Sequence, residues 1–450
     1  MPFSLTTEQI LALAPDASSA KAGRGLAGPR KWVTLGTDDQ AIWGECQGSG
    51  SKPYQVQIDL ATGDLAYRCS CPSRKLPCKH TLGLLLLRAT EADKFTATTP
   101  PDWVSDWLAK RAQAAQKRAA KRDQPQVVNT EAQAKRAAKR EAKISAGLQE
   151  LEQWLHDLIR QGLADLPGRP ISFWFTPAGR MVDAQAPGVA RMLRDMAGIP
   201  NSGTGWQSRL LERLGRLHLL IEGFKRLDTL PAATQADIRT TLGLTIREDD
   251  LLSEPGLRDH WLILGQQVEK EENLTVQRTW LWGQTSHRPA LLLSFAAFNQ
   301  TLDHSLLPDS RLEAELVFYP GAVPLRAAVK ERHTPPEPLD PTTLPALPTI
   351  SAATGAYATA LAANPWIERY PFLLGDVTII RQGNRWAARD SANDTLPFAP
   401  GFQDGWQFLA RSSSHPALLA GEWDGNHLLP LNFWPDEVDR VGTRFCASAS

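Results

Sequence analysis

The sequence predicts an α+β protein of several domains: a small ββα finger near the N-terminus, a mixed α/β body, and a small antiparallel β domain at the C-terminus. Three observations support this class. The 450 residues are too many for one ordinary hydrophobic core. Short runs of alternating polar and apolar residues, bounded by turn pairs, occur towards both ends of the chain. Between them, apolar residues recur at helical spacing.

The residue composition is that of a soluble protein, with 42% hydrophobic and 22% charged residues. The net charge of zero hides an asymmetry, because residues 1–148 carry 22 Lys+Arg against 14 Asp+Glu and the remainder carries 27 against 35. A basic front end therefore precedes an acidic body. No stretch approaches the roughly 20 apolar residues of a membrane helix, and the first residues do not resemble a signal peptide. We expect a cytoplasmic protein without a membrane segment.

The first predicted domain spans residues 1–100. "KWVTLG" and "QAIWGECQ" are typical of short strands, and "YQVQIDL" and "LAYRCSC" flank an "ATGD" turn, which predicts a β-hairpin. "TLGLLLLRATEA" then has the length and leucine content of a buried helix. This arrangement predicts the ββα finger.

Residues 101–143 are predicted to form a basic helical arm or linker. The hexapeptide "KRAAKR" occurs twice, at 117–122 and 135–140, and each copy places Lys-Arg pairs four residues apart on one helix face. Pro125 should interrupt the helix between the copies. The segment from Lys110 to Lys143 holds 11 Lys/Arg and three acidic residues. Such runs are usually solvated surfaces, but this one could also bind phosphates or an acidic protein.

Three further segments complete the predicted organisation. Residues 144–332 form the mixed α/β body, which begins with an amphipathic helix from Ile144. Six prolines in 333–349 predict a stiff linker over 333–350. Residues 351–450 form the small β-rich domain, in which the turn pairs Gly383-Asn384 and Asp424-Gly425 separate alternating runs.

Three of the five cysteines lie within ten residues, beside a histidine, in the pattern Cys69-x-Cys71-x₆-Cys78-x-His80. Three thiolates and one imidazole are ligands that tetrahedral Zn²⁺ prefers. Cys69 and Cys71 are two apart at a strand end, so their side chains leave on one face. A redox pair is a poorer interpretation because Cys-x-x-Cys is absent, and a catalytic zinc would need an open position. The pattern predicts a structural Zn²⁺ that joins the hairpin to the helix.

Cys-x-Cys-x₆-Cys-x-His between a hairpin and an apolar helix resembles the SWIM zinc finger, and "WGECQGSGSKPYQVQIDL" with "CSCPSRKLPCKHTLGLLLL" resembles the bacterial proteins that carry this finger near the N-terminus. The resemblance implies that Cys69, Cys71, Cys78 and His80 are the ligands. It implies DNA or protein binding, and an assembly with a MoxR-type AAA+ ATPase and von Willebrand A-domain proteins.

The other two cysteines are Cys46, which we expect to be a buried free thiol and not a fifth ligand, and Cys446, an incidental thiol near the C-terminus. His156 and His218 fall within amphipathic helices and are predicted to be ordinary helix residues. Gly-Lys, His-Glu-x-x-His and Gly-x-Ser-x-Gly are all absent, so no enzyme class is indicated.

The expected function is a binding module for DNA or RNA or for a protein partner; the alternative is a protein-interaction adaptor that binds no nucleic acid. The zinc loop and the two repeats supply the candidate binding residues: Arg74, Lys75, Lys79, Lys117, Arg118, Lys121, Arg122, Lys135, Arg136, Lys139 and Arg140. Nucleic-acid binding through them would be strongly salt-dependent.

Overall fold

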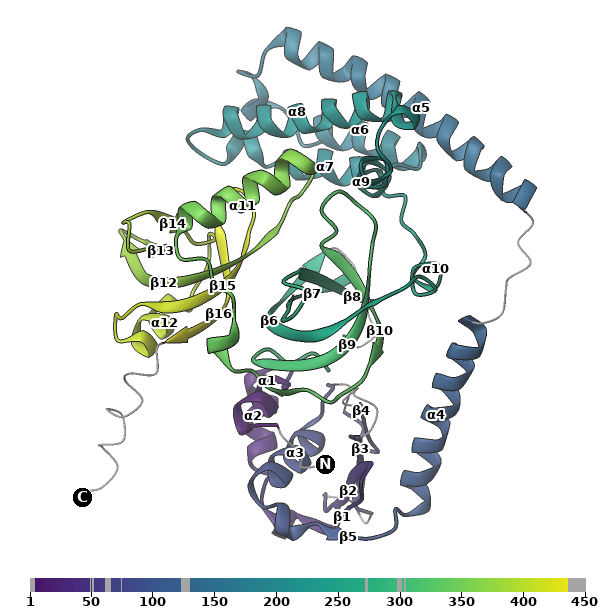
Figure 1. Ribbon diagram of the computed structural model, residues 1–450, viewed down its shortest axis with the longest axis vertical. Helices are drawn as coiled ribbons and strands as arrows, with labels where there is room; N and C mark the ends of the chain where they lie inside the picture. Colours follow the sequence, from purple (N-terminus) through teal and green to yellow (C-terminus); the bar gives the residue numbers. More distant parts are fainter. Residues whose placement is uncertain are drawn as a thin grey trace.

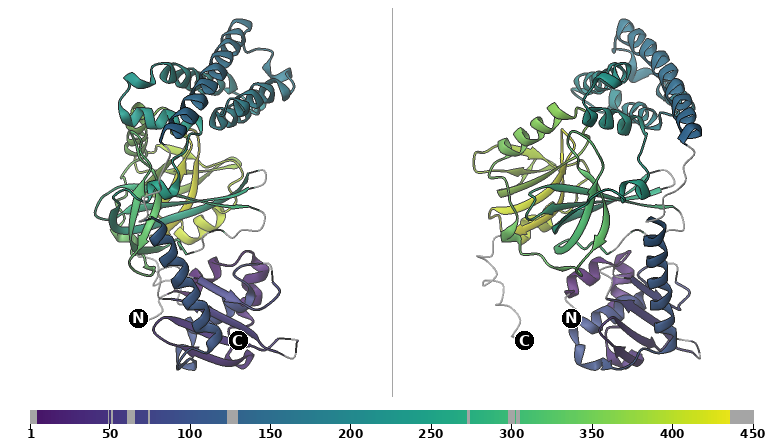
Figure 2. Two further views of the ribbon diagram at one scale, coloured as in Figure 1. Left: turned by 90° about the vertical axis from the view of Figure 1, so that its right-hand side faces the viewer. Right: turned by 45° about the vertical axis from the view of Figure 1, so that its right-hand side comes forward.

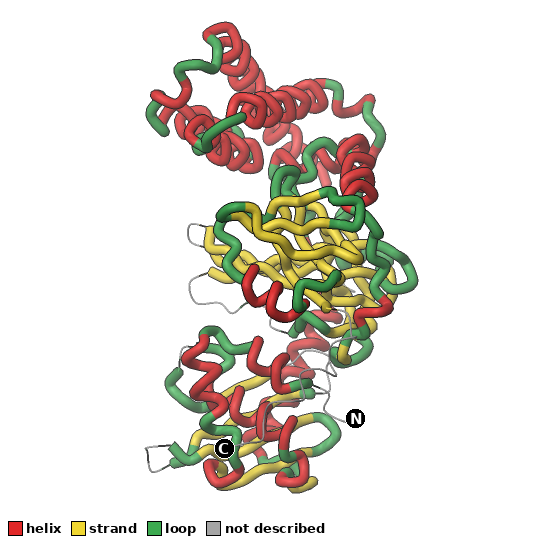
Figure 3. The backbone as a smooth tube through the Cα atoms, turned by 90° about the vertical axis from the view of Figure 1, so that its left-hand side faces the viewer, coloured by secondary structure: helices red, strands yellow, loops and turns green. Residues whose placement is uncertain are grey.

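The structure is a computed structural model that describes residues 5–48, 50, 52–60, 66–73, 75–122, 130–271, 274–297, 302 and 305–435. Three layers follow one another along the long axis of the molecule (Figure 1). A mixed α/β unit from the N-terminal part lies at one end, two β domains lie side by side in the middle, and a helical bundle lies at the other end. Figure 3 shows the same division by secondary structure. The α+β class is confirmed.

The N-terminal unit is a five-stranded sheet in the order β4-β3-β2-β1-β5, covered by helices on one face. Its elements are α1 (Thr7–Ala12), α2 (Ala17–Arg24), β1 (Trp32–Thr37), β2 (Ala41–Cys46), β3 (Tyr54–Asp59), β4 (Ala66–Cys69), α3 (Lys79–Thr90) and β5 (Thr96–Ala97). The β3–β4 hairpin pairs Val56 with Cys69, as predicted for a ββα finger. Helix α2 crosses α3 closely, because a Cβ atom at Gly23 of α2 would lie 2.7 Å from the Cβ of Leu82 in α3.

Helix α4 (Asp102–Arg122) covers the opposite face of this sheet. On β2, Ile42 packs towards α3, whereas Ala41 and Trp43 pack against Val104 of α4. Adjacent residues of a strand point to opposite faces, so β2 is buried on both sides. The first half of the predicted basic arm is therefore part of the N-terminal unit. Figure 2 shows α4 running along this unit towards the helical bundle.

The helical bundle contains five main helices, and short α10 follows it. They are α5 (Thr130–Gln161), α6 (Ser172–Asp183), α7 (Pro187–Met196), α8 (Trp206–Lys225), α9 (Ala232–Leu242) and α10 (Glu248–Leu251). The predicted apolar stripe of α5 enters the bundle core at Ile144 and continues through Leu148, Leu151 and Leu155. Residues 130–143 of α5 precede the first core residue.

The first β domain is a small closed barrel. Its strands are β6 (Leu257–Glu271), β7 (Leu274–Gly283), β8 (Pro289–Ala297), β9 (Ser310–Phe318), β10 (Arg326–Arg332) and the short β11 (Glu337–Pro338). The order β6-β7-β8-β10-β9 closes through β9 and β6, and among these pairs only β8 and β10 run parallel. This is the strand order of the OB-fold, a five-stranded Greek-key barrel. A fold of this type does not by itself indicate a function.

The second β domain packs against the barrel. It contains α11 (Ile350–Ala363), β12 (Tyr370–Gln382), β13 (Arg385–Arg389), β14 (Thr395–Pro397), α12 (Gly405–Ser412), β15 (Ala417–Trp423) and β16 (Leu428–Pro435). The strand order is β14-β13-β12-β15-β16, and both predicted turn pairs join neighbouring antiparallel strands. Trp280 on the outside of the barrel packs into an apolar layer with Leu373 and Ala420. The middle of β7 is thus covered by this domain.

A buried ionic network crosses the contact between the two β domains. The fully buried carboxylate of Glu422 accepts bonds from the guanidinium of Arg278 (3.1 Å), the indole N–H of Trp280 (2.9 Å) and the guanidinium of Arg369 (2.8 Å). Arg278 also binds Glu269 at 2.7 Å. Each buried charge therefore has an opposite charge beside it.

Two predicted segments differ in the structure. Residues 144–332 were expected to form one mixed α/β body, but they form two units, because the helices have their own core and the strands that follow form the barrel. The Pro-rich segment 333–350 is extended but packed, since β11 pairs with β9 and Leu344 lies in the layer between the two β domains. Within the described residues, no helix is long and apolar enough to cross a membrane.

Candidate metal centre

The four predicted ligands meet where the β3–β4 hairpin joins α3. Cys69 ends β4, Cys71 follows two residues later, Cys78 is the N-cap residue of α3, and His80 lies in the first turn of that helix. Their sulfur and nitrogen donor atoms all lie within 4.8 Å of one another. Hairpin and helix thus each supply two donors, as the sequence predicts.

The cluster has the dimensions of a tetrahedral zinc site. The Nδ1 atom of His80 lies 3.8 Å from the Sγ of Cys69 and 3.9 Å from the Sγ of Cys78. With Zn–S near 2.3 Å and Zn–N near 2.0–2.1 Å, a tetrahedral ion holds its S and N ligands about 3.5–3.8 Å apart. The Cys₃His set therefore fits Zn²⁺, and Cys69, Cys71, Cys78 and His80 would hold it.

Electrostatics of the cluster favour a divalent cation. The hydrogen bond from the Cys69 thiol, with smaller contributions from His80 and Thr81, lowers the pKa of Cys78 to about 3 despite its burial. The same thiol–thiolate contact raises the pKa of Cys69, and burial raises the pKa of Cys71. A metal ion must therefore compete with protons for the sulfurs of Cys69 and Cys71. Zinc binding requires all three to be deprotonated, so it releases protons.

The centre is closed by protein on the helix side. Cys78 is 1% exposed and His80 is 5% exposed, whereas Cys69 and Cys71 are half-buried. The ring of Tyr54 lies 4.8 Å from that of His80, and the hydroxyl of Thr81 lies 3.4 Å from the Cys78 sulfur. Four protein donors leave no open position for a substrate, which is typical of structural zinc.

The remaining cysteines behave as expected where the structure describes them. Cys46 is fully buried in the sheet core and is a free thiol outside the donor cluster. Burial raises its pKa. Cys446 lies outside the described residues.

The basic residues of the zinc loop are only partly available. Lys79 is exposed at the start of α3. Lys75 is exposed, but its ammonium group pairs with Asp16 at 2.7 Å. Arg74 lies outside the described residues. Of the three predicted basic residues, Lys75 is thus already paired with the carboxylate of Asp16, the N-cap residue of α2.

The two "KRAAKR" copies occupy separate helices. The first copy ends α4, and the side chains of Lys117, Arg118, Lys121 and Arg122 lie outside the described residues, as does Pro125. The second copy lies in α5 before the bundle core, where Lys135, Arg136 and Lys139 are exposed and Arg140 is half-buried. In Figure 1 the first half of α5 projects past the other helices of the bundle and lies away from the zinc finger.

Two further groups of possible metal donors occur in the described part of the chain. Glu152, His156 and His218 lie together on α5 and α8, with the two imidazole rings exposed and 6.2 Å apart. A lysine ammonium, that of Lys225, already binds the Glu152 carboxylate at 2.5 Å. Likewise, Lys330 binds Glu315 at 3.1 Å in the Glu315, Glu331 and His333 group. In each group, a lysine of the protein therefore already binds one of the carboxylates that a metal ion would need.

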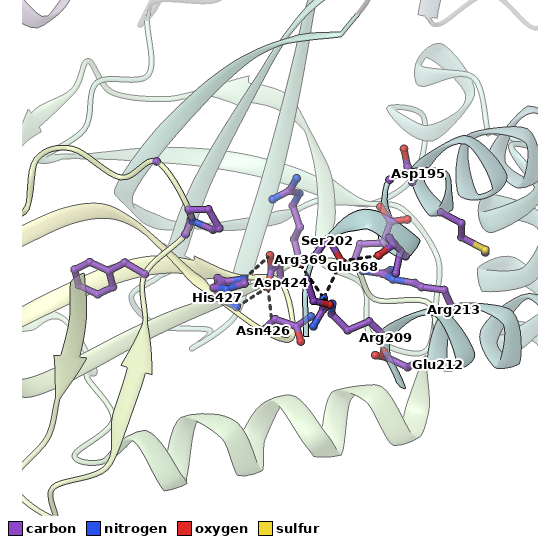
Figure 4. A pocket seen from close by; sticks show the side chains of 18 of the residues that line it. Asp195, Ser202, Arg209, Glu212, Arg213, Glu368, Arg369, Asp424, Asn426 and His427 are labelled. Atoms are coloured by element: carbon purple, nitrogen blue, oxygen red, sulfur yellow. Dashed lines mark hydrogen bonds and ion pairs between the residues drawn. The ribbon is translucent and has the colours of Figure 1, made fainter. Parts of the chain in front are cut away.

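Sequence reasoning missed a groove of about 1370 Å³ between the helical bundle and the C-terminal β domain (Figure 4). Six arginines and four acidic residues line it. The arginines are Arg191, Arg194, Arg209, Arg213, Arg369 and Arg385. They come from α7, from α8, from the residue before β12 and from β13, so no local sequence pattern indicates that they share a site.

Family models match two parts of the chain. Residues 54–89 match the SWIM zinc finger, and residues 139–242 match the SWIM-associated four-helix bundle domain. The first range contains all four donors, and the second contains most of the helical bundle. The chain therefore carries a SWIM zinc finger with its associated helical domain, as its cysteine spacing predicts. No curated protein and no solved structure matches the chain.

Proposed function

We propose that this SWIM protein is a nucleic-acid-binding module, for DNA or RNA, in which zinc is structural and no catalytic centre is involved. The finger presents Lys79, and the first half of α5 presents the larger basic surface. The closed Cys₃His set supports a structural role for the metal, since no coordination position is left for a substrate.

The observation that carries this proposal is the exposed basic surface in the first half of α5, residues 135–143 (the basic half of α5). Lys135 and Lys139 are four residues apart, so they lie on one helix face, with Arg136 beside them. All three are exposed, and Ile144 is the first core residue among the side chains of α5 that the structure describes. A helical row of cations at this spacing can meet successive phosphates, and phosphate contacts supply most non-specific affinity.

Titration of labelled single-stranded and double-stranded DNA and RNA at about 50 and 200 mM salt tests the proposal. The wild-type protein should bind, and affinity should fall steeply with salt. Replacing Lys135, Arg136 and Lys139 with Gln should weaken binding and reduce the log–log salt slope by about 2–3 units. The control variant Arg226→Gln, Arg239→Gln changes two exposed arginines of the bundle and should leave the affinity and the salt slope unchanged. No binding by the wild type at either salt would contradict the proposal.

A second candidate function is the protein-interaction adaptor, with an AAA+ ATPase and a von Willebrand A-domain protein as partners. Exposed apolar side chains on the bundle favour it: Ile159, Ile171, Phe175, Val182, Leu211 and Leu219. Exposed apolar residues that gather on one domain are typical of protein interfaces. Co-purification of such a partner should then survive nuclease treatment and be lost with Ile171→Asp and Leu211→Asp.

A further inference from the structure

The groove between the bundle and the C-terminal β domain carries charge that the protein itself does not neutralise. Arg191 pairs with Glu368 at 2.9 Å, and Arg369 pairs with Glu422 at 2.8 Å. In the described part of the chain, no carboxylate lies within ion-pair distance of Arg194, Arg213 or Arg385. These three guanidinium groups are available to an external anion.

Three of the four acidic side chains of the groove are already bound to other groups of the protein. Glu212 is committed to Arg216, and Glu368 to Arg191. The Asp424 carboxylate accepts hydrogen bonds from the backbone N–H groups of Asn426 and His427, and these bonds stabilise the turn between β15 and β16. Residues 149–450 carry eight more acidic than basic residues, so a groove with six arginines and four acids runs against the bias of the surrounding body.

The arginines lie on both walls of the groove. Arg194 (α7) and Arg213 (α8) are half-buried on the bundle side, and Arg385 (β13) is exposed on the side of the C-terminal β domain. Figure 4 shows Arg213 on the helical wall and Asn426 across from it. A ligand that used all three cations would have to span the groove and carry several anionic groups.

The same groove offers aromatic and amide groups. Phe175 lines it and is 44% exposed, so the face of its ring is accessible to a ligand in the groove. Asn384 and Asn426 add side-chain amides that can donate and accept hydrogen bonds. Cations beside an exposed aromatic ring are the groups that single-stranded nucleic acid uses, through its phosphates and its bases.

We propose that this groove binds a single strand of nucleic acid, with phosphates on Arg194, Arg213 and Arg385 and a base against Phe175. The inference rests on the proposed function and adds to it the stacking surface that the basic half of α5 lacks. The groove volume exceeds the roughly 300–1,000 Å³ of ordinary small-molecule pockets, which favours a polymer segment over one nucleotide. A duplex keeps its bases paired and offers none to Phe175.

The test compares full-length zinc-loaded variants in binding a labelled oligothymidine strand and its duplex. The triple variant Arg194→Gln, Arg213→Gln, Arg385→Gln should bind the single strand at least about tenfold more weakly and the duplex as the wild type does. Phe175→Ala should weaken single-strand binding by about tenfold. The matched control Arg226→Gln, Arg239→Gln, Arg389→Gln removes two bundle charges and one from β13 outside the groove, and should change nothing.

The outcomes separate this inference from the proposed function. The α5 variant could lose affinity while the groove variant binds the single strand as the wild type does. That result would contradict binding in the groove and would still support binding by the basic half of α5. Absence of any nucleic-acid binding by the wild type would overturn both. If ATP at the same nucleotide concentration displaced the strand, the groove would be a mononucleotide site and not a site for a polymer.

Discussion

Cys78 is both the N-cap residue of α3 and a donor of the zinc cluster, so one substitution reaches two roles. Its side chain makes no capping hydrogen bond and is directed to the other donors. The N-terminal end of a helix also favours a thiolate at this position. Loss of the sulfur therefore removes a metal ligand without removing a cap bond.

Cys78→Ser should abolish stoichiometric zinc binding and unfold the finger. Structural zinc contributes about 10–16 kcal/mol to the folding of zinc-finger peptides at pH 7, far more than a cap. Zinc content by atomic emission and near-ultraviolet circular dichroism measure the two effects. Cys46→Ala is the matched control, because this buried thiol is outside the cluster, and it should keep one zinc per chain. Retention of zinc by the Ser variant would contradict the ligand assignment.

Asp237 links folding to pH. This carboxylate is 6% exposed in α9 and accepts the backbone N–H of Ala322 at 2.9 Å. Burial raises its pKa from 3.8 to about 6. The folded state thus holds a proton that the unfolded state loses near pH 4. Stability should fall as pH rises from about 4 to 6, and this contribution should be constant above that range.

Asp237→Asn should remove this dependence while keeping an oxygen for Ala322. At pH 7 the variant should be more stable than the wild type by about 1–3 kcal/mol, and the difference should vanish below about pH 4. Urea unfolding at both pH values measures it. An equal difference at the two pH values would show that the change acts through packing and not through ionisation.

At the scale of elements, the ion network of Glu422 holds the barrel against the second β domain. Glu422→Ala should lower the free energy of unfolding by about 3–5 kcal/mol, because Arg278 would stay buried with only Glu269 to bind. Chemical unfolding followed by tryptophan fluorescence would measure this loss. Glu269→Gln removes a half-buried partner of the same arginine and should cost less. Equal costs would contradict the dominant role of Glu422.

Several elements could be predicted because their signals are local. The hairpin before Cys69, the leucine-rich helix α3 and the turn pair Gly383-Asn384 are each contained in a short stretch with the correct period or turn residues. The zinc centre was predictable for the same reason, since its spacing alone brings four donors to one hairpin–helix junction.

Other elements could not be predicted because they depend on distant partners. Closure of the barrel requires β10 to pair with both β8 and β9, and nothing in "PLRAAVKE" specifies either strand. Docking of α4 depends on Val104 meeting Trp43 across the sheet. The pairing of Lys75 with Asp16 likewise joins residues 59 apart in sequence. Such contacts follow from tertiary packing, which residue periodicity does not encode.

For the whole molecule, the separate cores indicate that zinc removal affects the stability of one part and not of the others. The N-terminal unit, the bundle, the barrel and the C-terminal β domain each have a main hydrophobic cluster, although Leu307 of the barrel domain also packs into the first. Zinc joins elements of the first cluster only. Its removal should therefore unfold one end of the molecule and spare the others.

Hydrogen exchange measured by mass spectrometry, before and after zinc chelation, tests the structural-zinc finger most directly. We expect amide protection to be lost in β3, β4 and α3, while α7, α8 and the strands of the barrel and of the C-terminal β domain keep theirs. Re-addition of one equivalent of zinc should restore protection. Unchanged protection of the β3–β4 hairpin and α3 in the zinc-free protein would show that zinc does not stabilise the finger.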